Sequence, residues 1–305
     1  MSNEKPISIK GLPAFLEATN LKKYQKHEHF HVIKFTDHKE EMPKHVFMRS
    51  ENYFEVTLSE SNEVDITVDG KRVGCEGSSI FFLSPGQTLH LDVHEKKKKG
   101  RGYMLLFTID FLNFVTTEFN VIQQFPYFNM HLASLYSLEQ AHSNILFQYI
   151  EQIYHEFQKL DEDNIEIIRS LLTLLLFEAK RLLKAKTLKN VINSRAEEIT
   201  FQFENLLKKT ECKKQTLGYY ASQLNISAIY LSECVKKATG KSAKKIVTEY
   251  LLFEAKSLLS ESMQTVDAIA FQMGFGDTPN FIKFFKKNTQ KTPHQFRKML
   301  HAATG

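Results

Sequence analysis

The C-terminal third of this 305-residue chain contains two copies of one pattern. In the first halves Thr216 and Ala221 recur as Thr265 and Ala270, an offset of 49. In the second halves the offset is 50, and it relates Leu231, Val235, Lys236 and Lys237 to Phe281, Phe285, Lys286 and Lys287. One residue is therefore gained at the turn between the halves. Each copy predicts a short helix with a small alanine, a tight turn and a second helix with apolar residues four apart, which is a helix-turn-helix.

The outward positions of the two second helices are candidate base-contacting residues. A helix held in a major groove by a partner helix meets base edges with the side chains opposite its packed face. These positions are Ile229, Tyr230, Ser232 and Glu233 in the first copy and Thr278, Asn280, Ile282 and Lys283 in the second. Asn280 and Lys283 are favoured because asparagine pairs with adenine and lysine donates to guanine. The lysines expected to meet phosphates are Lys236, Lys237, Lys286, Lys287 and Lys291.

Charge and helix length agree with DNA recognition. Residues 201–305 hold 16 Lys and Arg against 8 Asp and Glu, a net charge of +8, which leaves −3 of the total +5 for residues 1–200. Phosphate backbones attract a basic domain of this kind. A helix expected over residues 243–260 separates the copies and is about 25 Å long. Two recognition helices that enter successive major grooves lie about 34 Å apart, so one chain could occupy both.

The N-terminal part has a different pattern. Short alternating segments between about residues 45 and 109 predict strands, with Asp69-Gly70 as a type I′ hairpin turn. Many short strands in this span predict a small antiparallel barrel or jelly roll. Two helices follow, between about 140 and 185, and the second is apolar enough either to pack on the barrel or to form a dimer interface. We expect an α+β chain with a sensor and dimerisation domain at 1–185, a linker at 186–200 and a DNA-binding domain at 201–305.

Cysteine content and hydropathy favour a soluble cytoplasmic protein. Cys75, Cys212 and Cys234 form no pairable set and lack zinc-finger spacing. The N-terminus has no apolar segment of signal-peptide length, and no run of 18 apolar residues occurs. We therefore expect an unprocessed chain that does not contact membranes.

Candidate sites other than the DNA-binding surface are weaker. His27, His29 and His31 alternate, and His45, His90 and His94 lie in the same domain, but without a convincing carboxylate ligand they are read as surface or edge-strand residues. No metal and no cofactor are predicted. Three aromatic residues are candidates to line a ligand cavity in the barrel, although aromatics on buried strands are more often core: Phe82, Tyr103 and Phe107. No nucleophile elbow, P-loop or carboxylate pair indicates catalysis.

The C-terminal motifs resemble the DNA-binding domain of the AraC/XylS family of bacterial transcription regulators. The resemblance rests on Ile269-Ala270, Gly274-Phe275, Phe284 to Lys287 and Thr292-Pro293. A looser similarity to that family's cupin-like sensor domain lies in Asp69-Gly70, the segment ending at Gln87 and Gly102 to Phe107. The chain departs from the family at three positions: Leu251 replaces an arginine, Glu233 a basic residue and Gln290 a glycine.

The sequence thus predicts a regulator that reads adjacent major grooves of double-stranded DNA, is a homodimer and responds to an unidentified small effector. RNA polymerase is a further candidate partner. The alternative is a cupin-type metal-dependent enzyme with a helical appendage.

Overall fold

The computed structural model describes residues 5–303 apart from 39–40, 61–63, 75–76, 94–100, 113–120, 126, 129–133, 160, 184–193, 210–214 and 262–263. The chain forms two compact units, residues 1–115 with 119–193 and residues 116–118 with 194–305. Cys75, Cys212 and His94 lie outside the described residues, as does most of the predicted linker.

The strands of the first unit form two five-stranded sheets. Their order is β1-β3-β8-β5-β6 in one sheet and β10-β7-β4-β9-β2 in the other. The strands are β1 (Ile7–Ile9), β2 (Phe30–Lys34), β3 (His45–Ser50), β4 (Tyr53–Ser59), β5 (Val64–Val68), β6 (Lys71–Val73), β7 (Ser79–Leu83), β8 (Thr88–Val93), β9 (Gly102–Thr108) and β10 (Ser134–Ser137). Both sheets are open, with two edge strands each among the described residues, so the predicted cupin-like barrel is not confirmed, and the strands form two packed sheets, the arrangement of the jelly-roll alternative. All pairings are antiparallel except that of β1 with β3.

The hairpin between β5 and β6 confirms the turn predicted at Asp69-Gly70. Both residues have positive φ, 48° and 79°, as a type I′ turn requires. β5 and β6 pair antiparallel directly on either side of it. Strands β1, β2 and β10 lie outside the span in which strands were predicted.

A hydrophobic core fills the space between the sheets. Met48 and Leu89 enter it from β3 and β8, and Leu83 and Leu106 from β7 and β9. The α-helix α1 (Leu12–Ala18) closes this core with Leu12 and Phe15, and a 3-10 helix (Lys22–Tyr24) follows it. Each sheet therefore buries alternate residues of its strands, as the period of two predicted.

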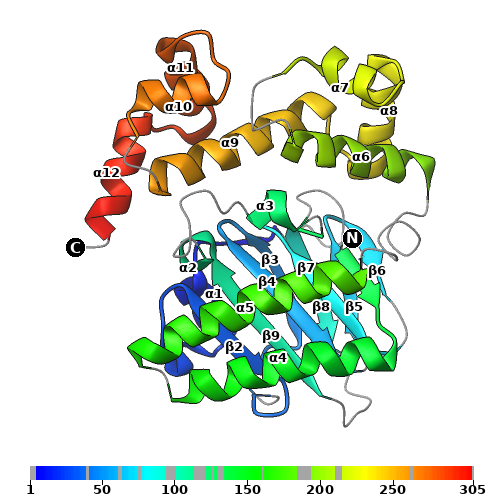
Figure 1. The fold of residues 1–305 in the computed structure, drawn as a ribbon, viewed down its shortest axis with the longest axis vertical. Helices are drawn as coiled ribbons and strands as arrows, with labels where there is room; N and C mark the ends of the chain where they lie inside the picture. The colour runs from blue at the N-terminus through cyan, green and yellow to red at the C-terminus, as the bar shows by residue number, and fades with distance from the viewer. Residues whose placement is uncertain are drawn as a thin grey trace. The chain divides into compact units, whose positions relative to one another are not determined.

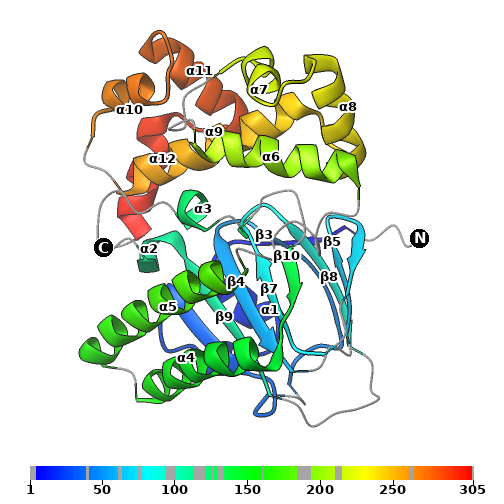
Figure 2. The same ribbon diagram turned by 45° about the vertical axis from the view of Figure 1, so that its right-hand side comes forward.

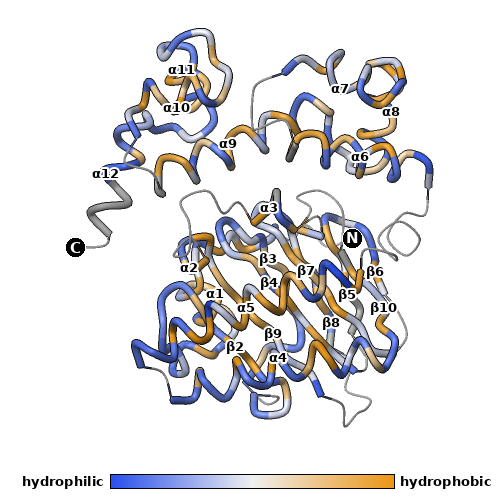
Figure 3. The backbone as a smooth tube through the Cα atoms, viewed as in Figure 1, coloured by the Kyte–Doolittle hydropathy of each residue, from blue (hydrophilic) through white to orange (hydrophobic). Residues whose placement is uncertain are grey.

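Two long helices cover the other face of the second sheet, where they lie side by side (Figures 1 and 2). They are α4 (Gln140–Gln158) and α5 (Glu162–Leu183); two short helices, α2 (Ile109–Leu112) and α3 (Val121–Gln124), precede them. Phe157 of α4 packs edge-on against Phe30 of β2, with ring centroids 5.7 Å apart. Hydrophobic residues recur along both helices (Figure 3), which explains why they bury one face against the sheet.

Helix α5 also carries apolar residues on its outer side. Ile168, Leu172 and Leu175 are buried, whereas Ile167 and Leu174 are 44% and 47% exposed. The wide apolar stripe seen in the sequence is thus divided between a face that packs inside the unit and a second face directed to solvent.

In the second unit, every described element of secondary structure is a helix. Its helices are α6 (Arg195–Lys209), α7 (Leu217–Gln223), α8 (Ala228–Thr239), α9 (Ala243–Glu261), α10 (Val266–Gln272), α11 (Thr278–Thr289) and α12 (Pro293–Ala303). Helix α6 begins inside the predicted linker, so part of that stretch belongs to the helical unit. In the part of the chain that the structure describes, no helix is both long and apolar enough to cross a membrane.

Candidate DNA-binding surface

Helices α7 and α8 form the first helix-turn-helix. The side chains of Thr216 and Ser227 cap their N-termini, accepting from the backbone N–H of Tyr219 at 3.2 Å and of Tyr230 at 3.1 Å. The turn between them passes through Asn225, which has a φ of 54°. A short polar residue tolerates this left-handed conformation better than most others. The recognition helix α8 is therefore defined at its start by a cap of the predicted kind.

Helices α10 and α11 repeat this arrangement with a turn longer by one residue. Thr265 caps α10 through the N–H of Ala268 at 3.2 Å, and Asp277 caps α11 through the N–H of Asn280 at 2.7 Å. Gly274 has a φ of 73° and takes the place of Asn225. The turns span residues 224–227 and 273–277, which confirms that the extra residue of the second copy lies there.

Helix α9 packs against both helix-turn-helix units. Its first half contributes Ala243 and Ile246 to the buried residues near α8, and its second half contributes Ala255 and Leu259 to a core with α10 and α11. Figure 1 shows α7 and α8 at one end of α9 and α10 and α11 at the other. Leu251 is 7% exposed and belongs to that core, so this departure from the family replaces a polar residue with a packed one.

The anchors of the two recognition helices are fully buried. Leu231 and Val235 in α8, and Phe281 and Phe285 in α11, are all 0% exposed. The opposite face of each helix is open to solvent. Its exposed members, among the candidate base-contacting residues, are Ile229, Tyr230, Glu233, Asn280 and Lys283. The division of each helix into an anchored and an exposed face is therefore the one that the sequence predicted.

Two candidate base-contacting residues of α11 hydrogen-bond to carboxylates of their own unit. The Asn280 amide Nδ2 donates to the Asp277 carboxylate at 2.8 Å, and the Thr278 hydroxyl donates to Asp267 at 2.5 Å. The Asp277 carboxylate therefore occupies one of the two hydrogens of the Asn280 amide nitrogen, and the other hydrogen and the amide oxygen remain for adenine. The same bond holds the side chain at the start of the recognition helix, where base contacts are made in helix-turn-helix proteins.

Three further candidates differ in their surroundings. Ser232 is half-buried and donates to the Ala228 carbonyl at 2.8 Å, within its own helix. Ile282 packs against the core of the second unit. A hydrogen bond with the Cys234 thiol raises the pKa of the Tyr230 hydroxyl, so this exposed tyrosine is neutral at physiological pH. Ser232 and Ile282 thus stand at the edge of the exposed faces.

The predicted phosphate-contacting lysines are all exposed. Lys236 and Lys237 lie in the last turn of α8, and Lys286 and Lys287 in the last turn of α11. Lysine at a helix C-terminus is favoured by the helix dipole even without a ligand. Lys291 is exposed beyond α11, whereas its counterpart Lys241 is half-buried and pairs with Glu249 at 3.0 Å.

Sequence reasoning missed a second pair of basic residues. Lys244 and Lys245 are exposed in the first turn of α9, immediately after α8. Positive side chains at a helix N-terminus are unfavourable because they oppose the helix dipole. Their presence there therefore indicates a role in binding rather than in helix stability. That mismatch was visible in the sequence and would have added both lysines to the candidate phosphate contacts.

The candidate ligand-binding aromatics of the first unit do not line the space between the sheets. Phe82 stacks on Tyr127 with centroids 3.9 Å apart, and Phe107 stacks on Phe54 at 5.3 Å. Tyr103 packs against Phe147 of α4 at 6.2 Å. All three are buried on the sheet face that the helices cover, because they alternate along their strands with the residues of the inter-sheet core.

The histidines are divided among different environments. His31 lies on the edge strand β2 as predicted, but it is 2% exposed, and burial lowers its pKa to about 4. His45 and His90 meet on the outer face of the first sheet with Asp92 between them. Asp92 is the carboxylate that the sequence reasoning did not place.

Comparison with known proteins identifies the helical unit. Residues 220–299 match the family model described as a helix-turn-helix domain. The raffinose operon transcriptional regulatory protein RafR of Pediococcus pentosaceus is 34% identical over 91 residues, which are 30% of this chain and 32% of RafR. The transcriptional activator RhaS of Klebsiella pneumoniae is 31% identical over 77 residues, 25% of this chain and 28% of RhaS.

A solved structure matches the same region. The C-terminal domain of the two-component response regulator yesN from Fusobacterium nucleatum is 32% identical, and the match covers 34% of this chain and 99% of that domain, with a TM-score of 0.31. The chain spans about a third of the length of RafR and less of RhaS. Residues 220–299 therefore form an AraC-type helix-turn-helix domain, which the chain shares with these transcription regulators.

Proposed function

We propose that the protein is a sequence-specific, DNA-binding transcription regulator that reads two adjacent major grooves. The observation that carries this proposal is the pair of capped recognition helices, α8 and α11, whose anchored faces both pack on α9. At 1.5 Å per residue the 19 residues of α9 extend about 28 Å. This length is comparable with the spacing of about 34 Å between successive major grooves.

The exposed residues divide into two proposed roles. Ile229, Tyr230, Glu233, Asn280 and Lys283 contact base edges, with Ser232, Thr278 and Ile282 at the margin of the same surface. Glutamate accepts from the cytosine amino group, which gives Glu233 a role that a basic residue could not fill. The lysines at the ends of α8 and α11, together with Lys291, neutralise phosphates and fix the position of the domain on the duplex.

The first unit acts in this proposal as the sensor and self-association domain. Its two packed sheets are consistent with a cupin-like fold that takes a small effector. In this proposal, effector binding changes how the DNA-bound protein contacts RNA polymerase. Because a bacterial transcription regulator acts on DNA in the cytoplasm, we propose the cytoplasm as its location. The alternative of a cupin-type enzyme draws no support from the relatives, whose shared region is the helix-turn-helix domain.

Self-association is proposed through the outer face of α5. Ile167 and Leu174 are seven residues apart and exposed, and Leu171 lies between them half-buried. Apolar residues at this spacing form the contact stripe of paired helices. Substitution of Leu174 with lysine should convert a dimer to a monomer in sedimentation experiments, while Lys180→Gln, which changes a half-buried lysine of the same helix, leaves the dimer intact. A dimer that persists in Leu174→Lys would move the interface elsewhere.

Selection from random duplexes tests the proposed function directly. The full chain should enrich one motif that extends over about two helical turns, and footprints should show protection on one face of the DNA. A mixed library that yields no enriched motif, under conditions where the protein binds duplex DNA, would overturn sequence-specific regulation and leave only general DNA binding.

A further inference from the structure

Three side chains with metal-binding atoms meet on the outer face of the first sheet. His45 begins β3, and His90 and Asp92 lie two residues apart on β8. The antiparallel register places His45 opposite Asp92 and Phe47 opposite His90. Residues two apart on a strand share a face, and the intervening Val46 and Leu91 belong to the core between the sheets or pack against it. The cluster therefore points away from that core.

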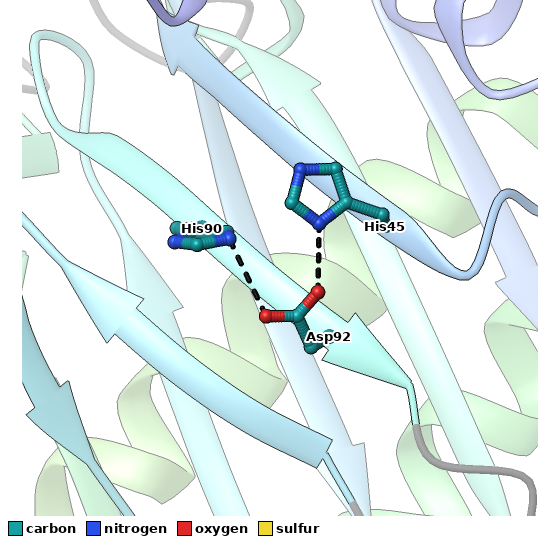
Figure 4. Close-up of side chains that lie close together, drawn as sticks. All are labelled: His45, His90 and Asp92. Atoms are coloured by element: carbon teal, nitrogen blue, oxygen red, sulfur yellow. Dashed lines mark hydrogen bonds and ion pairs between the residues drawn. The ribbon is translucent and has the colours of Figure 1, made fainter. Parts of the chain in front are cut away.

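The donor atoms are close together (Figure 4). His45 Nδ1 lies 2.7 Å from Asp92 Oδ1, and His90 Nε2 lies 3.4 Å from Asp92 Oδ2. One ligand atom from each residue falls within 4.8 Å of those of the other two. The two imidazole rings are edge to face with centroids 4.9 Å apart. The carboxylate thus presents one oxygen to each histidine.

The Nε2 atom of His90 is a second sign of a missing ligand. This nitrogen is shielded from solvent, and its only close polar neighbour among the described residues is Asp92 Oδ2, at 3.4 Å without the geometry of a hydrogen bond. Phe47 packs on the same imidazole with ring centroids 5.2 Å apart, which limits the positions the ring can adopt. A shielded nitrogen without a hydrogen bond costs free energy, and a coordinated metal ion would remove that cost.

The donor set selects the class of ion. Two imidazole nitrogens and one carboxylate oxygen suit zinc and other first-row transition metals, whereas calcium and magnesium prefer oxygen ligands. Zinc bonds to these atoms are about 2.0–2.2 Å long, so donors around a tetrahedral ion lie about 3.4 Å apart. His90 Nε2 already lies at this distance from Asp92 Oδ2, while His45 Nδ1 faces the other carboxylate oxygen, Oδ1. The His45–Asp92 pair must open by less than an ångström, and water can fill the fourth position because all three side chains are partly exposed.

We propose that His45, His90 and Asp92 bind one zinc ion on the outer face of the sheet, where it links β3 to β8. This site lies outside the inter-sheet core in which an effector of the proposed sensor would bind, and it is independent of DNA recognition. Because zinc would hold the two strands together only in the folded state, its binding also stabilises the first unit.

Titration of the chelator-treated full chain with zinc chloride tests this proposal. Calorimetry should give one zinc ion per chain, and His90→Ala and Asp92→Asn should each weaken binding at least about tenfold. His155→Ala is the matched control, because His155 is an exposed histidine on α4, outside the cluster, and should leave affinity unchanged. Far-UV circular dichroism of the metal-free variants verifies that they are folded.

Cobalt substitution provides a readout that does not depend on the variants. Cobalt bound to the wild-type chain should show visible absorption typical of tetrahedral nitrogen and oxygen ligands. One equivalent of zinc should displace the cobalt and remove this absorption. Absence of stoichiometric zinc binding to the wild-type chain would overturn the proposal, and so would affinity that both His90→Ala and Asp92→Asn retain. Neither result would bear on DNA binding, which is measured separately.

Discussion

Gly240 and Gln290 end the two recognition helices in the same left-handed conformation, with φ values of 72° and 62°. The backbone N–H of each donates to a lysine carbonyl of the preceding turn, Lys236 at 2.9 Å and Lys286 at 2.8 Å. Glycine adopts this conformation without a steric penalty, whereas a residue with a Cβ atom does not. The second unit therefore carries strain at its C-cap that the first unit avoids.

Substitution of Gln290 by glycine should relieve this strain. We expect the free energy of unfolding to rise by about 1 kcal/mol, measured by urea denaturation followed through the helical signal. Gly240→Gln introduces the same strain in the first unit and should lower stability by a similar amount. Equal stability of Gln290→Gly and the wild-type chain would mean that the Gln290 side chain makes compensating contacts.

Asn280→Ala should weaken binding to the preferred duplex by about 1–3 kcal/mol and relax preference at one base pair. The loss is expected only on the preferred duplex, because Asn280 lies exposed at the start of α11, where it is proposed to contact a base. Competition binding against random DNA measures the difference. The Asn280 backbone N–H, which donates to the capping carboxylate of Asp277, is unchanged by the substitution, so the helix start is preserved. An equal loss on random DNA would assign Asn280 to positioning.

Lys286→Ala should weaken binding to all duplexes alike and reduce the dependence of log affinity on log salt concentration by about 0.9. Lys286 is exposed and can contact a DNA phosphate, and each such contact releases about one counterion condensed on the duplex. Lys241→Ala is the control, since Lys241 pairs with Glu249 at 3.0 Å. A salt dependence that both variants leave unchanged would remove Lys286 from the phosphate contacts.

A buried carboxylate in the first unit gives a prediction about pH. Glu55 of β4 is 2% exposed, lies between the sheets beside Leu83 and Leu106, and accepts from the Thr57 hydroxyl at 2.7 Å. Burial raises the pKa of Glu55 from 4.5 to about 7. The folded state thus keeps its proton where the unfolded state loses it, and stability falls as pH rises from about 4.5 to 7.

Glu55→Gln should remove this penalty, because the amide imitates the protonated carboxyl group. The variant and wild-type chains should be equally stable near pH 4.5, and above pH 7 the variant should be more stable by up to about 3 kcal/mol. Denaturation at several pH values measures the difference. Buried His31 also lowers the stability of the fold as pH falls toward 4. This effect is the same in the variant and the wild-type chain, so it cancels in the difference between their free energies of unfolding. A difference that is constant with pH would contradict the protonated state of Glu55.

The helical unit was predictable in detail because its residues act locally. A cap such as Ser227, a turn residue such as Gly274 and anchors such as Phe281 are fixed by spacing along one or two helices. Side-chain hydrogen bonds were not predictable in the same way. Nothing in the order of residues indicated that Asn280 and Thr278 would each bind a nearby carboxylate, although both bonds affect how the surface meets DNA.

The first unit was predicted less well because its arrangement depends on contacts between distant segments. The periodicity identified β4, β5, β7 and β9 but could not show that the strands divide into two open sheets. It also could not show that Phe82 would stack on Tyr127, which is 45 residues away along the chain. His45 and Asp92 are 47 residues apart, so their meeting follows from strand register alone.

In the proposed binding mode, the sharing of α9 by both helix-turn-helix cores restricts the operators that this protein can use. Since one rigid helix fixes the angle between α8 and α11, neither can turn around the duplex without the other. Insertion of about five base pairs between the two contacted segments would rotate one of them half a turn away, to the far side of the DNA. The natural targets should therefore vary in base sequence but hardly in the number of base pairs between those segments.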